Sequence, residues 1–168
     1  MTNISLKRKM SKRDYDKLHS TLPKFFVELY LSYTDMGYNE ALIDKKVKWY
    51  ELASYIFKED NGNTSKVYLH LNDFVTIQEE QYKESYAIVK GIFKHVGNDK
   101  NNYAFIVVDW FEKVNQEHSI LKCPYYHLQT KNWRRVFPIN LLQSVQKVHF
   151  VRYDNTKWIK NNFYFTAI

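Results

Sequence analysis

The side chains most often used in catalysis and metal binding are scattered singly along this sequence. Six histidines occur with no HExxH motif and no closely spaced pair, at His19, His70, His95, His118, His127 and His149. Cys123 lies four residues before His127. A catalytic thiolate needs a base and an orienting group placed in three dimensions, and spacing alone does not supply them. A structural zinc site would need clustered cysteines and histidines, so we expect no metal site.

Two pairs of acidic residues are the remaining catalytic candidates. Glu79 with Glu80, and Asp109 with Glu112, could hold a metal ion for phosphoryl chemistry, although neighbouring acids in a loop are more often a solvated charge run. The four glycines stand at positions 37, 62, 91 and 97, too far apart for a phosphate-binding loop. The sequence therefore predicts a protein that is not an enzyme, with no catalytic residue and no cofactor.

Charge is distributed unevenly along the chain, whose formal net charge is +7. Residues 1–13 carry five basic and no acidic side chains, whereas residues 14–130 carry 13 basic and 17 acidic ones. Residues 131–168 carry seven basic side chains and one acidic one, Asp154. This pattern predicts one edge that faces phosphates and one acidic face for a basic partner.

The basic residues near the two ends are candidates for nucleic-acid binding. They are Lys7, Arg8, Lys9, Lys12, Arg13, Lys131, Arg134, Arg135, Lys147, Arg152, Lys157 and Lys160. In the second group, Trp133 and Trp158 alternate with the charges, as on surfaces that bind nucleic-acid backbones. The alternatives are a solubilising tail for the first group and a sheet edge protected by lysines for the second.

The composition indicates the cellular compartment in which the protein works. A single cysteine cannot form an internal disulfide, no apolar run approaches the roughly 20 residues of a membrane helix, and the basic N-terminus lacks the apolar core of a secretory signal. We expect a soluble, intracellular protein that does not bind membranes. The cluster at residues 7–13 is also typical of nuclear import, so we expect a nuclear location.

Helical periodicity marks the N-terminal part of the chain. Ser11 can cap a helix that runs to about Leu22, and Pro23 can open a second one that ends near Gly37. A third helix is expected from Asn39 to the polar turn at residues 59–63. These helices carry more apolar surface than one sheet face needs, which predicts self-association or a protein partner.

Strand signals follow from residue 63 onward. Residues 67–77 are strand-like, and residues 86–96 and 103–114 form a hairpin signature around residues 97–102. A second pair is expected from residues 125–129 and 135–137 across residues 130–132, then a helical turn at 139–144 and strands at 148–151, at Trp158 and at 163–165. The predicted fold class is α+β, with N-terminal helices packed on a bent antiparallel sheet or small β-barrel. The expected parts are a basic flexible arm (1–13), a helical part (14–62) and a β domain (63–168), with the last two in one folded unit.

Several segments of this β part resemble a bromo-adjacent homology domain. Residues 67–77 are similar to its opening "D-x-V" strand, residues 86–93 to the strand that leads to its "I-x-x-I" segment, and residues 107–111 to its "V-x-W-F" strand. Residues 126–130, 136–142 and 147–151 are similar to its closing strand pair, helical turn and "C-x-V" strand. The resemblance covers residues 66–152 and implies a non-catalytic nuclear module that binds chromatin or another nuclear protein.

A histone tail is one partner that the resemblance implies. Methylated lysine is recognised by two to four aromatic faces, because its ammonium group is attracted to ring quadrupoles. Tyr86, Trp110 and Trp133 are the candidates for such a cage, with Asp109 or Glu112 as the adjacent acid. The alternative is that Trp110 and Tyr86 are core residues.

The sequence thus supports two functions of different classes. The first is a nuclear interaction module that binds chromatin or a protein partner and contacts DNA phosphates without sequence preference. The second is a structural subunit of a larger nucleic-acid-processing complex of the transposase-related kind.

Overall fold

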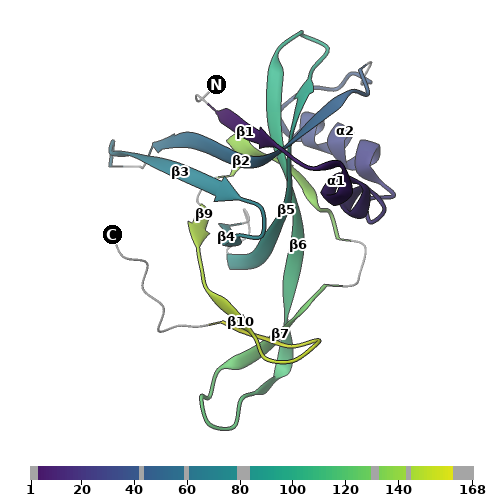
Figure 1. Cartoon of the computed structure of the whole chain (residues 1–168). Helices are drawn as coiled ribbons and strands as arrows, with labels where there is room; N and C mark the ends of the chain where they lie inside the picture. The colour runs from purple at the N-terminus through teal and green to yellow at the C-terminus, as the bar shows by residue number, and fades with distance from the viewer. Residues whose placement is uncertain are drawn as a thin grey trace.

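Two long strands, β5 (Glu84–Val96) and β6 (Asn102–Glu117), form the spine of the molecule (Figure 1). The computed structural model describes residues 4–41, 44–58, 61–78, 84–129, 133–142 and 145–160. The two strands pair antiparallel from Ala87 with Trp110 to Val96 with Asn102, around a turn in which the Gly97 amide donates to the Asn101 carbonyl. The hairpin predicted at this place is confirmed.

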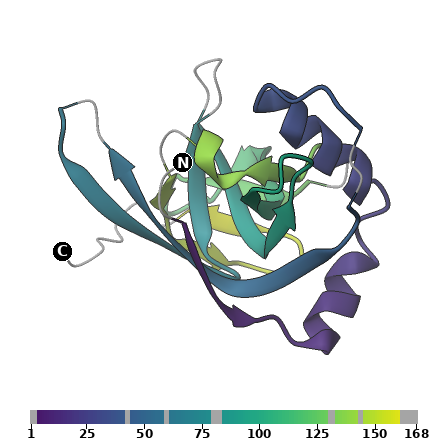
Figure 2. The same cartoon turned by 90° about the horizontal axis from the view of Figure 1, so that it is seen from above.

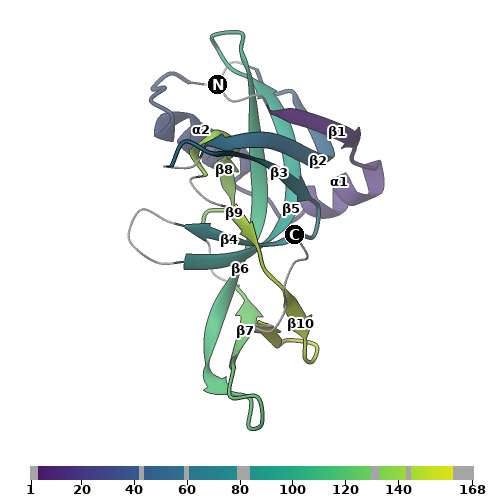
Figure 3. The same cartoon turned by 90° about the vertical axis from the view of Figure 1, so that its left-hand side faces the viewer.

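The other elements are arranged around this hairpin, and every strand pairing is antiparallel. They are β1 (Ser5–Lys9), α1 (Lys12–His19), α2 (Phe25–Asp35), β2 (Val47–Lys58), β3 (Thr64–His70), β4 (Phe74–Gln78), β7 (Pro124–Leu128), β8 (Val136–Pro138), the 3-10 turn η1 (Ile139–Leu141), β9 (Val145–Lys147), β10 (Phe150–Arg152) and β11 (Trp158–Lys160). The main strand order is β1-β2-β5-β6-β7-β11-β10, and β3, β4, β8 and β9 branch from it. Figure 3 shows β6 passing from the upper part of the molecule to the lower part, where it meets β7 and β10.

The predicted α+β class is wrong, because the described part of the chain is mainly antiparallel sheet with two short α-helices. The third helix expected from Asn39 is largely replaced by strand β2. Its aromatic and β-branched residues suit a strand, and β2 pairs with β1, β3 and β5, so long-range pairing overrides the helical spacing of its apolar residues. The sheet also stays open, so a closed barrel is not formed.

Two local expectations also need correction, and two more concern segments outside the described residues. Residues 5–9, expected in a flexible arm, form strand β1. Strands β7 and β8, expected to pair with each other, both pair with β6, because its 16 residues offer room for β8 at Phe105–Val107 and for β7 farther along. The expected turn at 130–132 and the expected strand at 163–165 lie outside the described residues.

The two predicted N-terminal helices are confirmed, although α1 ends at His19 instead of near Leu22 and α2 begins at Phe25 instead of at Pro23. The Ser11 hydroxyl accepts a hydrogen bond from the Asp14 amide at 3.2 Å, which caps α1. Helix α2 ends before Gly37, whose φ of 95° is a left-handed conformation that favours glycine. Seen from above in Figure 2, the two helices lie to one side of the sheet and β3 extends toward the other. Among the described residues, no helix is long and apolar enough to cross a membrane.

Hydrophobic clusters fill both faces of the upper hairpin. Along β6, Tyr103, Phe105 and Val107 pack with the helices, whereas Ala104, Ile106 and Val108 pack toward β3, β4 and η1. This alternation is the two-residue period of a strand that is buried on both sides. A third cluster at the lower end contains Ile88, Phe111, Tyr126 and Phe150, with Phe111 and Phe150 stacked at 4.2 Å between ring centroids.

A polar network also holds α2 against the hairpin turn. The Tyr33 hydroxyl lies 2.7 Å from His95 Nδ1, and His95 Nε2 lies 2.6 Å from the Asp44 carbonyl oxygen. Since the carbonyl can only accept, Nε2 carries the proton and Nδ1 accepts from Tyr33. Burial, together with the neighbouring Tyr103 and Asp99, raises the pKa of Tyr33 above its usual range, so this hydroxyl stays protonated and can donate.

Close packing of α1 on β5 depends on Gly91. A Cβ atom at this position would lie 2.7 Å from Leu18 Cδ2 and 2.8 Å from Trp49 Cζ3, closer than side chains normally approach. We predict that Gly91→Ala destabilises the protein by about 1–3 kcal/mol because the core is then overpacked. Urea unfolding measures this. Adding Leu18→Ala opens space beside the new methyl group, so the double variant should lose less than the sum of the two single losses; strict additivity would show that crowding at Leu18 is not the cause.

Candidate nucleic-acid interface

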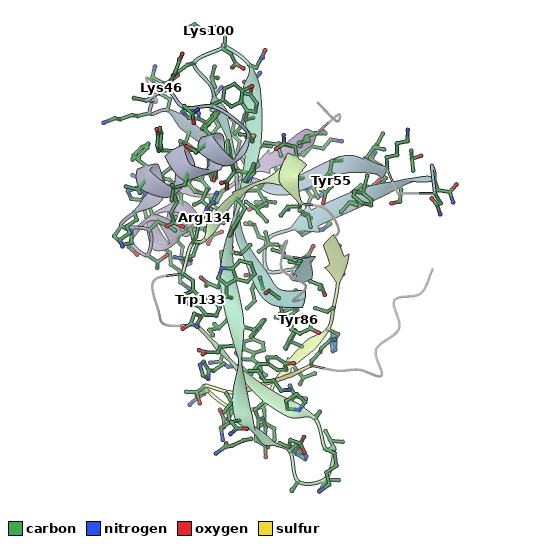
Figure 4. All side chains as sticks on the ribbon, turned by 180° about the vertical axis from the view of Figure 1, so that it is seen from behind. Lys46, Tyr55, Tyr86, Lys100, Trp133 and Arg134 are labelled. Atoms are coloured by element: carbon green, nitrogen blue, oxygen red, sulfur yellow. The ribbon has the colours of Figure 1, made fainter. Side chains whose placement is uncertain are left out.

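The three aromatic cage candidates do not face one pocket. Trp110 is 4% exposed, belongs to the core cluster on the β3 side of the hairpin, and donates from Nε1 to the Arg134 carbonyl at 2.7 Å. Tyr86 is half-buried in the lower cluster, while Trp133 is exposed, and Figure 4 shows these two on either side of β6. The expected cage is therefore wrong, and Trp110 takes the alternative role of a core residue.

The two acids expected beside the cage are bound within the protein. Asp109 forms an ion pair with Arg135 at 2.6 Å. One oxygen of Glu112 lies 3.1 Å from His127 Nε2 and accepts from the Gln129 side-chain amide at 2.9 Å. Both carboxylates therefore already have partners within the protein.

Arg134 and Arg135, expected to bind phosphates, instead join the helices to the sheet. The Arg134 guanidinium pairs with Asp35 at the end of α2 and donates to the Ser32 hydroxyl at 2.8 Å. The Arg135 guanidinium donates to the Val108 carbonyl, and to the Thr21 carbonyl at 2.8 Å, in addition to its ion pair with Asp109. Replacement of either arginine would leave polar groups without partners, so its first effect would be on stability.

The remaining basic candidates fall into separate regions. Three of the first group lie on the edge strand β1, and two lie on α1: Lys7, Arg8, Lys9, Lys12 and Arg13, all exposed. Lys147 pairs with Asp73 at 3.2 Å, and Lys160 donates to the Tyr86 hydroxyl at 2.9 Å. Lys131 lies outside the described residues. Arg152 and Lys157 lie together at the turn between β10 and β11.

A cavity of about 710 Å³ lies where the β10–β11 turn faces β4 and β5. Its lining residues are Asn72, Phe74, Ile88, Lys90, Val114, His127, Leu128, Arg152, Asn155, Thr156, Lys157 and Trp158. A second cavity of about 390 Å³ adjoins α1. It is lined by Met10, Asp14, Lys17, Leu18, Thr21, Leu71, Asn72, Lys90, Asp109 and Arg135. Asn72 and Lys90 line both, so the two cavities adjoin at this pair of residues, and we name the two cavities together the basic groove.

Lys90 occupies the middle of the basic groove because of a β-bulge. The register of β5 on β6 shifts between Val89 and Gly91, which leaves Lys90 without a partner in the ladder, and such a bulge redirects its side chain. Its Nζ lies 3.3 Å from the side-chain oxygen of Asn72. The Asn72 backbone has a left-handed φ of 70°, and its N–H donates a hydrogen bond to the Val89 carbonyl at 2.7 Å. The turn before β4 is therefore fixed beside Lys90.

The β10–β11 turn fixes the basic residues at the other end. Asp154 accepts hydrogen bonds from the amides of Thr156 and Lys157 at 2.8 and 2.9 Å, and these bonds lower the pKa of its carboxyl. Arg152 donates to the carbonyls of Asp154 and Asn155, which places its guanidinium 5.8 Å from the centroid of the Trp158 ring. The turn thus presents a cation and an aromatic ring side by side.

A third cavity lies along α2, next to the basic groove but outside it. It has a volume of about 400 Å³ and shares Thr21, Asp109 and Arg135 with the second cavity. Lys24 and the exposed Trp133 belong to its lining. Basic and aromatic side chains therefore occur together in this cavity, as Lys24 with Trp133, and in the 710 Å³ cavity, as Arg152 with Trp158. The two tryptophans come from different segments of the chain.

The catalytic candidates remain apart in the structure. Among the described residues there is no group of three or more histidine, cysteine, aspartate or glutamate side chains that could hold a metal ion. Cys123 is half-exposed, and the nearest base along the chain, His127, contacts Glu112 through Nε2. Glu79 and Glu80 lie outside the described residues.

Sequence reasoning missed Lys17 and Lys90, which come from the acidic middle of the chain. Lys17 lies on the solvated side of an amphipathic helix, and nothing in its neighbourhood along the sequence distinguishes it. Lys90 had one signal: it precedes a glycine within a long apolar strand, and such a glycine often marks a bulge or a close backbone approach. Comparisons with protein-family models, with curated proteins and with solved structures found no match.

Proposed function

We propose that this protein is a non-catalytic module that binds a nucleic-acid strand through phosphate contacts in the basic groove. The observation that carries the proposal is that four cations from three elements line the two adjoining cavities: Lys17 of α1, Lys90 of β5, and Arg152 and Lys157 of the β10–β11 turn. Among the described residues, none of the four is ion-paired with a carboxylate. Each can therefore neutralise a phosphate without first breaking an ion pair within the protein.

The acids in the basic groove do not cancel its charge. Asp14 and Asp109 line the α1 end, and Asp109 is already neutralised by Arg135. Asp14, in the first turn of α1, subtracts one positive charge. The two cavities still hold five cations, Lys17, Lys90, Arg135, Arg152 and Lys157, against the two carboxylates, so the lining keeps an excess of positive charge.

The mode of binding that follows is electrostatic and independent of sequence. Phosphate contacts release condensed counterions, so affinity falls linearly on a logarithmic scale with salt, with a slope set by the number of contacts. Four contacts correspond to a slope of about −3. Non-specific binding of this kind has dissociation constants in the micromolar range or weaker at physiological salt.

The proposal includes a chromatin setting in the nucleus. Two observations support this setting: the exposed basic residues of β1 and α1, and the resemblance to bromo-adjacent homology domains described above. In this setting the same exposed edge serves import and additional phosphate contacts, since both depend on accessible positive charge.

The first test neutralises the basic groove. We predict that the variant Lys90→Gln, Arg152→Gln, Lys157→Gln weakens binding of labelled DNA at low salt by ten-fold or more and reduces the salt slope by about 2 to 3. Fluorescence anisotropy between 50 and 200 mM salt measures both. The matched control, Lys48→Gln, Lys58→Gln, Lys66→Gln, removes the same charge from exposed positions of β2 and β3. If the two variants lose equal affinity for DNA, net charge alone explains the loss and the groove is rejected as the binding site.

A second candidate function is that of a structural subunit in a nucleic-acid-processing complex. The observation that favours it is an exposed apolar strip on α2, in which Phe26, Val27, Tyr30 and Leu31 are 37–59% exposed. Contiguous apolar surface of this kind often marks a protein interface.

Self-association tests this second candidate. We predict that the weight-average mass in light scattering rises with concentration for the wild type, and that Val27→Asp with Leu31→Asp returns it to the mass of one chain, because charge opposes burial of the strip. Both positions are exposed in the isolated chain, so the melting temperature should stay unchanged. A wild type that is monomeric at every concentration would contradict self-association through α2.

A further inference from the structure

The large cavity of the basic groove has a lining that phosphate contacts alone do not require. Its floor is apolar, built from Phe74, Ile88, Val114, Leu128 and Trp158, which come from five strands. Its volume of about 710 Å³ lies in the range of sites that enclose small organic ligands. A phosphate bound at the rim would leave this apolar floor exposed to water. The ligand that fits must therefore carry an apolar or aromatic group as well as negative charge.

Trp158 gives that floor an aromatic surface with a fixed orientation. Its ring meets Phe74 and Phe111 at steep angles, with centroids 5.7 and 5.6 Å away and interplanar angles of 61° and 70°. The guanidinium of Arg152 lies 5.8 Å from the same ring. Both an indole and a guanidinium present flat faces on which a nucleobase stacks, with little dependence on which base it is.

Positive charge surrounds this aromatic surface on more than one side. Lys90 enters the lining from the β5 bulge, and Arg152 and Lys157 enter from the β10–β11 turn. Lys157 is held in place by Gln116, whose side-chain oxygen lies 3.4 Å from Nζ, and by the Tyr125 ring, whose centroid is 5.0 Å from Nζ. A base in the cavity would thus have cations available for the phosphates on either side of it.

We propose that the large cavity receives an unstacked base of a single-stranded nucleic acid, which rests on the proposed function of the basic groove. In a duplex the bases are paired and stacked inside the helix, so only phosphates could reach the rim. A single strand can place a base against Trp158 and Arg152 while its phosphates contact Lys90 and Lys157. The protein therefore prefers single strands to duplexes that carry the same number of phosphates.

The experiment compares three probes with about equal numbers of phosphates: a labelled 24-nucleotide single strand, a duplex of 12 base pairs, and a 24-nucleotide strand made of abasic sites. Anisotropy at constant salt should give the single strand about ten-fold tighter binding than either other probe, since one stacked base contributes about this factor. Trp158→Leu keeps an apolar floor but removes the stacking surface, so it should bring single-strand binding down to the abasic level. The control Tyr68→Leu, at an exposed aromatic residue of β3 that lines neither cavity of the basic groove, should change nothing.

The outcomes separate this inference from the function on which it rests. Equal binding of the three probes, with the salt dependence of phosphate contacts, would overturn the base pocket and leave the basic groove standing. No binding of any probe would overturn both. If Trp158→Leu fails to fold, as judged by its melting curve, the comparison of single strand with abasic strand on the wild type decides the question, and Trp158→Phe, which keeps a smaller stacking face, should retain part of the preference.

Discussion

Between Tyr103 and Val108, strand β6 is buried on both faces, and this double burial is the constraint on which the other elements depend. The helices pack on one face, and β3, β4 and η1 enclose the other. Each fully buried side chain of this kind contributes about 1.5–3 kcal/mol, so the strand cannot be shifted by one residue without exchanging two cores. The register of β6 on β5 is therefore fixed, and with it the position of the bulge at Lys90.

The bulge links this core to the candidate site. Lys90 is displaced from the ladder at the point where Gly91 allows Leu18 and Trp49 to approach the backbone. The same strand segment thus packs against α1 on one side and supplies a cation to the basic groove. In the same region the Arg135 side chain bonds to Thr21, Val108 and Asp109, and so holds the segment after α1 against β6. The site is consequently built on rigid, buried elements at its α1 end and on a hydrogen-bonded turn at Arg152 and Lys157.

Much of the local structure could be predicted from the sequence, and the arrangement of the site could not. The β5–β6 hairpin, the cap at Ser11 and the end of α2 before Gly37 are encoded by residues close together in the chain. Strand β2 was mistaken for a helix because its apolar spacing fits both structures, and its three strand partners are distant in sequence. For the same reason Trp110 could not be assigned to core or pocket, and Arg134 and Arg135 looked free although their partners lie 99 and 26 residues away, at Asp35 and Asp109. Lys90 shares one cavity with Lys17 and the other with Lys157, and no local pattern in the sequence relates residues so far apart in the chain.

The central claim is that nucleic acid occupies the basic groove, and an NMR titration with a short oligonucleotide tests it most directly. The account predicts that the largest chemical-shift changes fall on the amides around Asn72, Lys90 and the β10–β11 turn, with smaller changes near Lys17, while amides of β3 and of the exposed strip on α2 keep their positions. Changes confined to β1, to β3 or to α2, with the groove amides unaffected, would contradict it.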